Sequence, residues 1–183
     1  MNKHLLNTAF LLFLIVIISL LAAPAIAQQK NPTLRSILLE QFKNSWNEQD
    51  WYVPVSRAVD GLTARQAMWK PADSSHSVGE LAYHLLFWNK EQLDKFEGRK
   101  VAAVDNNNET FTAFTEASWT ETVRQLNQVM ADWAKAIATA DDAKLNKWAS
   151  AIEHVNAHTA YHTGQILYIR KLAGNWDPDK GVK

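Results

Sequence analysis

The chain contains no cysteine, which excludes disulfide bridges, thiolate metal sites, cysteine nucleophiles and a lipid-modified N-terminal cysteine. It also lacks an excess of charge, because 19 basic and 19 acidic residues give a formal net charge of +0. A protein that binds nucleic acid needs a basic face to neutralise phosphates, so this balance argues against nucleic-acid partners. The same balance argues against an electrostatic tether to a membrane.

Several short motifs that carry catalysis are missing as well. The sequence has no glycine-rich phosphate loop and no Gly-x-Ser-x-Gly elbow. The zinc-peptidase pattern His-Glu-x-x-His is absent because Thr159 follows His158. Any metal site must therefore use His, Asp or Glu side chains, and it lacks the general base of that peptidase class.

Residues 1–27 have the composition of an export signal. Lys3 precedes an apolar run over residues 9–23, interrupted only by Ser19, and Ala25-Ile26-Ala27 follows. This order predicts a cleavable signal peptide, with an uncleaved membrane anchor as the alternative. The run is shorter than the roughly 20 residues of a spanning helix, so we expect no stable membrane span after cleavage. The prediction is an exported protein, periplasmic or secreted, whose mature domain covers residues 28–183.

Four long segments of the mature domain repeat apolar residues at three- and four-residue spacing, the pattern of amphipathic helices. The predicted helix starts are Asn31-Pro32, Ser77 with Glu80, Ser118 with Glu121, and Asp141 or Asp142. Each start offers a side-chain oxygen that can cap free backbone N–H groups. No segment alternates as a strand does. The sequence therefore predicts an all-α domain and, within that class, a four-helix bundle.

Residues 99–116, which we call the connector, form the longest stretch without a helical pattern and separate the second and third predicted helices. Its Asp105–Asn108 run is typical of an exposed turn. A connector of this length can carry the chain from one end of a bundle to the other. We therefore expect the second and third helices to be parallel.

Eight tryptophans are many for a chain of this length. Those expected to fill the core, by their helical spacing, are Trp46, Trp88, Trp133 and Trp148. Those near segment ends, which can line a pocket mouth or a dimer surface, are Trp51, Trp69, Trp119 and Trp176.

Three histidines form the one pattern with a clear chemical meaning. His158 and His162 are spaced i, i+4, which places two imidazoles on one helix face, and His84 lies in another predicted helix. Three such nitrogens can hold one divalent metal ion. The alternative is that these are structural or surface histidines. A buried imidazole, however, needs hydrogen-bond partners for both nitrogens or a metal for one of them.

Neighbouring polar residues suggest supporting roles. His154, one turn before His158, is an alternative ligand or a group beside the site or at the surface. Glu80 either caps its helix or reaches toward the metal. Gln165, three residues after His162, either supports a ligand or is merely solvated.

The sequence resembles the DinB-like family of four-helix metal-binding proteins. The resemblance covers about residues 33–174. It rests on Trp51-Tyr52-Val53-Pro54, Gly61-Leu62-Thr63, Trp69-Lys70-Pro71, Ser77-Val78-Gly79-Glu80-Leu81-Ala82-Tyr83-His84, Trp88 and His158-Thr159-Ala160-Tyr161-His162-Thr163-Gly164-Gln165. It implies His84, His158 and His162 as metal ligands. Many members carry an arginine after the last histidine, where this chain has Thr163, so that residue's role cannot be carried over.

Members of this family are often homodimers, and some resemble thiol-dependent S-transferases or metal-dependent hydrolases. Three imidazoles suit zinc, nickel or ferrous iron and leave an open coordination position. The first hypothesis is therefore a metal-dependent enzyme that hydrolyses a small substrate or transfers a thiol, although no general base is evident. The second is a non-catalytic metal-binding or stress-related protein of the periplasm. The third is a helical interaction module with incidental histidines.

Overall fold

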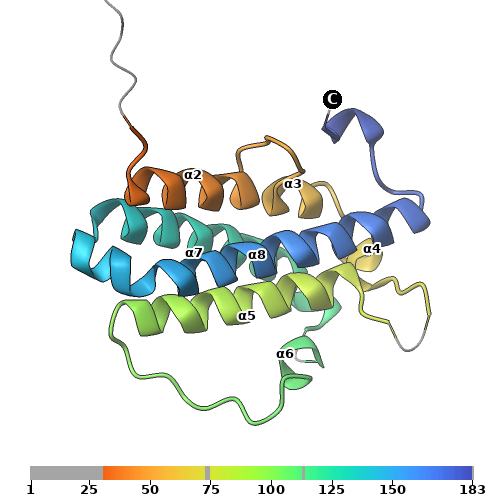
Figure 1. Cartoon of the computed structure of the whole chain (residues 1–183). Coiled ribbons are helices and arrows are strands. Elements are labelled where there is room, and N and C mark those ends of the chain that lie inside the picture. Colours follow the sequence, from red (N-terminus) through yellow and green to blue (C-terminus); the bar gives the residue numbers. More distant parts are fainter. Residues whose placement is uncertain (1–30, 73–74, 113, 183) are drawn as a thin grey trace, which may run out of the picture. The chain divides into compact units, whose positions relative to one another are not determined.

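A computed structural model describes residues 31–72, 75–112 and 114–182 (Figure 1). The long helices are α2 (Leu34–Trp46), α5 (Val78–Phe96), α7 (Trp119–Thr139) and α8 (Asp142–Leu172). The short helices are α3 (Val55–Val59), α4 (Ala64–Met68) and α6 (Glu109–Thr112), and the 3-10 turns are η1 (Glu116–Ser118) and η2 (Pro178–Lys180). No strand occurs in the described ranges, so the all-α prediction is confirmed.

The four long helices pack around a shared apolar core. Helices α5 and α2 each contact both α7 and α8. Trp133 of α7 lies at the centre of this core, fully buried against Phe42 and Phe96. Trp119, expected near a pocket mouth, is instead buried, and its indole N–H donates to the backbone carbonyl of Leu62. That bond explains why an indole at a helix end can be buried without an unpaired donor.

Helices α5 and α7 run in the same direction, as Figure 1 shows. Phe114, just before α7, lies against Gly79 at the start of α5. Farther along, the Trp133 indole N–H donates to the backbone carbonyl of Asn89 over 3.0 Å. The parallel arrangement predicted from the connector's length is therefore confirmed.

The connector itself differs from the prediction, because it contains the short helix α6. Thr110, Phe111 and Phe114 are all buried there. The exposed run Asp105–Asn108 does form the predicted turn region. A single helical turn such as α6 contains too few residues to give a recognisable helical pattern in the sequence. Burial against the rest of the fold stabilises it here.

Helix starts are partly as predicted. The reciprocal capping box of Ser77 and Glu80 opens α5, and Asp141 caps α8. The predicted Ser118–Glu121 box is wrong: the Ser118 side chain makes no capping bond to α7, and Glu121 pairs with Arg124.

The box lies one turn earlier, between Thr115 and Ser118, because η1 precedes α7 without a break. Helix α2 is capped by Thr33 with Ser36 rather than by Asn31. Overlapping Ser and Thr residues three apart offer several equivalent boxes, so the sequence pattern alone does not choose among them.

The predicted signal peptide, residues 1–27, lies outside the described residues. Within the described part of the chain, none of the helices combines the length and apolar character needed to cross a membrane.

Gly79 permits a close approach between the connector and α5. A Cβ atom at this position would lie 2.1 Å from ring carbons of Phe114. Only a residue without a side chain lets that ring lie on the first turn of α5. The glycine thereby fixes the connector beside the helix that carries His84.

We expect Gly79→Ala to lower the free energy of unfolding by about 1–3 kcal/mol, because the added methyl overpacks against Phe114. Gly164→Ala is the matched control, since a Cβ there meets nothing within 4 Å. In a helix interior it should raise stability by about 0.5–1 kcal/mol. Urea unfolding measures both variants, and equal effects would contradict the assigned role of Gly79.

Candidate metal centre

His84, His158 and His162 meet between α5 and α8. Each offers one ring nitrogen, and these three atoms lie within 4.8 Å of one another. The Nε2 atoms of His84 and His158 are 3.1 Å apart. His84 and His162 are buried and His158 is half-buried. The structure thus brings together the three histidines that the spacing selected.

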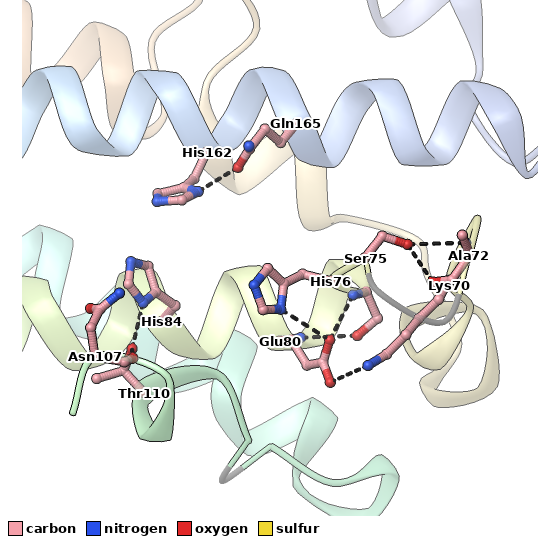
Figure 2. A network of polar contacts seen from close by, with 11 residues as sticks. Lys70, Ala72, Ser75, His76, Glu80, His84, Asn107, Thr110, His162 and Gln165 are labelled. Carbon is pink, nitrogen blue, oxygen red and sulfur yellow. Dashed lines mark hydrogen bonds and ion pairs between the residues drawn. The ribbon is translucent and has the colours of Figure 1, made fainter.

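His84 is held from outside by the connector, as Figure 2 shows. Its Nδ1 lies 2.6 Å from the Thr110 hydroxyl oxygen. That hydroxyl donates its single proton to the backbone carbonyl of Asn107 over 2.6 Å. The hydroxyl must therefore accept from His84, which assigns the proton of His84 to Nδ1 and a lone pair to Nε2.

His162 has an equivalent support on its own helix. Its Nδ1 lies 2.6 Å from Oε1 of Gln165, an atom that can only accept. The Gln165 amide nitrogen donates to the Tyr161 hydroxyl over 3.1 Å, which fixes the orientation of the amide. His162 is therefore also protonated at Nδ1, and its Nε2 carries a lone pair.

The imidazoles are kept neutral by their surroundings. Burial, with the repulsion of His162 and His158, lowers the pKa of His84 to about 3. Burial and His162 lower the pKa of His158 to about 4. Burial also lowers the pKa of His162, against the opposing effect of its Gln165 hydrogen bond. Near pH 7 these side chains have the uncharged form that binds metal ions.

Neutrality leaves the group with more lone pairs than protons. His84 and His162 each present an Nε2 lone pair, and only His158 can supply a proton, which its 3.1 Å contact would direct to His84. A divalent ion would satisfy all three nitrogens at once. Two nitrogens on one tetrahedral zinc ion lie about 3.3–3.4 Å apart, close to the 3.1 Å between the Nε2 atoms of His84 and His158. The three residues therefore fit a metal ion by donor type and by spacing.

Aromatic contacts hold the His84 ring in its plane. Phe111 of α6 stacks on His84 with ring centroids 3.9 Å apart and an angle of 7°. The His76 ring in turn stacks on Phe111, with ring centroids 3.9 Å apart and an angle of 11°. The connector thus fixes both the proton and the orientation of His84.

A cavity of about 480 Å³ opens beside the three histidines, all of which line it. Trp88, Phe111, Ala151 and Val155 form its apolar wall. Its other polar lining residues are Asn89, Gln92, Asn107 and His154. No Asp, Glu, Lys or Arg is among these described lining residues, so the cavity can take an uncharged molecule next to the ion site.

Residues 54–166 match the family model of the DinB superfamily. The chain belongs to the DinB superfamily. The matched range contains all three histidines and the connector. It begins after α2 and is therefore shorter than residues 33–174, the range over which the sequence motifs resemble the family. No curated protein and no solved structure gives a significant match.

In this DinB-superfamily chain the remaining candidates take distinct places. His154 lies outside the three-nitrogen cluster but lines the cavity. Glu80 is engaged away from the cluster by its capping box and a 2.6 Å ion pair with Lys70, and the pKa of its carboxyl is lowered because these contacts outweigh burial. Trp88, expected in the core, lines the cavity instead. Thr163 is buried and donates to the carbonyl of Thr159.

Sequence reasoning missed Thr110 and Phe111. The signal that could have found them was a threonine and a phenylalanine side by side in a connector that must pass His84 on its way along α5. Because α6 was not predicted, the sequence did not indicate that either side chain would point toward His84.

We expect the purified DinB-superfamily domain to bind about one zinc ion per chain. Loss of a contact that supports a metal ligand weakens metal affinity about 10–100-fold. His158→Ala should weaken zinc affinity by more than this, because it removes a ligand itself. His154→Ala is the matched control on the same helix and should keep its zinc. Equilibrium dialysis with elemental analysis measures both, and equal losses would show that His154 belongs to the ligand set.

Proposed function

We propose that this protein is a metal-dependent hydrolase of a small, uncharged substrate, with His84, His158 and His162 as the ligands of one divalent ion. The observation that carries the proposal is the cavity that shares all three histidines with the ion site. A purely structural metal site is usually closed by four protein ligands, whereas catalytic sites keep a position open. Three imidazoles facing a cavity support the catalytic alternative.

The metal is zinc, nickel or ferrous iron, since neutral imidazole suits each of them. A bound ion of this kind supplies Lewis acidity and lowers the pKa of a water molecule toward 7. The protein's own contribution is to hold the three Nε2 atoms toward one point. Trp88 and Phe111 give the cavity an apolar wall beside these nitrogens.

His154 is the proposed general acid–base group. It is the one ionisable lining residue, among those described, that the ion would not use. It lies one turn before His158 on α8, on the exposed side, where it can exchange protons with solvent. An imidazole suits this task because one ring nitrogen can donate a proton while the other accepts one.

The uncharged lining favours hydrolysis over thiol transfer. A small thiol co-substrate that carries carboxylates needs basic side chains to hold them, and the described lining offers no Lys or Arg. Export, proposed from residues 1–27, would also take the protein away from cytosolic thiols. Thiol transfer is therefore the second candidate reaction, and non-catalytic metal binding is the alternative to any reaction.

We further propose a homodimer that uses α8. Tyr161 and Tyr168 are each 63% exposed and Leu172 is 51% exposed. Their spacing places them on one face of the helix, with Gly164 between the two tyrosines. An exposed aromatic face of this kind suits contact with a second copy.

A test is to load the domain with zinc and assay uncharged amides and esters. We expect hydrolysis that is lost on chelation and in His158→Ala. His154→Gln should lower the rate by about 10²–10⁴-fold with the zinc content unchanged, because a proton-transfer group is removed.

Transfer of an added thiol to the same substrates would favour the S-transferase instead. A domain that keeps its zinc but turns over neither kind of substrate would support the non-catalytic alternative.

A further inference from the structure

The connector supplies the only described hydrogen-bond partner of His84 outside the histidine group. Thr110, in α6, lies 26 residues after His84 in the sequence, yet its hydroxyl oxygen is 2.6 Å from Nδ1. Thr110 is only 2% exposed, so water does not substitute readily for this contact. Its own proton is committed to the carbonyl of Asn107.

We propose that Thr110 is a positioning residue that selects the Nδ1–H tautomer of His84 and so keeps Nε2 free for the ion. This inference rests on the metal site of the proposed function but not on the hydrolytic reaction. A neutral imidazole has one proton, and a proton on Nδ1 leaves the Nε2 lone pair available. The 2.6 Å contact is built for that one tautomer.

The Nε2–H tautomer of His84 can make a hydrogen bond within the histidine group that competes with metal binding. A proton on Nε2 of His84 would lie toward Nε2 of His158, which is 3.1 Å away. The two histidines would then bond to each other, with His84 as the donor, and Nε2 of His84 could not bind a metal. Removal of the Thr110 hydroxyl leaves a buried Nδ1–H without an acceptor, which favours this self-bonded arrangement.

The route of the chain explains how the connector reaches His84. Because α5 and α7 are parallel, the connector must pass back along α5 (Figure 1). Phe114 is seated on Gly79, and the Trp88 indole N–H donates to the Asn107 side chain over 3.2 Å. These contacts on either side of Thr110 hold it opposite His84, where Phe111 stacks on the ring.

The test compares Thr110→Val, which keeps the shape but removes the hydroxyl, with Thr110→Ser, which keeps the hydroxyl. Zinc affinity is measured by competition with a chromophoric chelator. We expect Thr110→Val to bind zinc about 10–100-fold more weakly and Thr110→Ser to bind close to wild type. Equal affinity of Thr110→Val and wild type would overturn the inference.

A second measurement separates positioning from general damage to the connector. Nitrogen-15 NMR of the metal-free protein reports which ring nitrogen of His84 carries the proton. We expect Nδ1–H in wild type and Thr110→Ser, with a shift toward Nε2–H in Thr110→Val. Nε2–H in wild type would overturn the inference even if Thr110→Val failed to fold.

The outcomes also distinguish this inference from the proposed function. A wild-type protein that binds none of zinc, nickel and ferrous iron would overturn both. Zinc binding with equal affinities in all three proteins would overturn only the role of Thr110. Zinc binding with the expected order but without turnover would leave Thr110 as proposed and remove the hydrolase.

Discussion

Three neutral imidazoles share one space between α5 and α8, and together they have more inward lone pairs than protons. The Thr110 hydroxyl and the Gln165 carbonyl commit His84 and His162 to Nδ1–H, so their Nε2 atoms both point inward as acceptors. Burial and mutual repulsion lower the pKa values of His84 and His158, so neither imidazole takes up an extra proton near pH 7. A divalent cation would resolve this imbalance with the donors that are already in place.

The path of the connector links the rest of the fold to the three histidines. Parallel α5 and α7 require the chain to return along α5, and this return brings α6 to His84. Gly79 allows Phe114 to lie on the first turn of α5, which fixes the connector near the histidine. Two elements distant in sequence, α6 and α8, therefore complete a site whose third side is α5. The same arrangement makes Phe111 and Asn107 part of the cavity wall.

Periodicity and spacing were sufficient to predict the four long helices and the three histidines, because both depend on the regular repeat of 3.6 residues. His158 and His162 share a face by that repeat alone, and Ser77 with Glu80 marks a helix start through local bonds. Thr110 could not be found in this way, since its partner is a contact across 26 residues that depends on the connector's path. The predictions for Trp119 and for the Ser118–Glu121 capping box were wrong for a related reason, since the local sequence allowed several arrangements. Tertiary burial decided the position of Trp119, and the extra 3-10 turn decided which residues form the capping box.

Anomalous diffraction at the absorption edge of the metal that the purified protein retains tests the central claim most directly. The account predicts one strong peak between α5 and α8, about 2.0–2.1 Å from the Nε2 atoms of His84, His158 and His162, with a coordination position open to the cavity. A peak bound by His154 or by carboxylates elsewhere, or crystals grown with zinc, nickel and ferrous iron that show no peak among the three histidines, would contradict it.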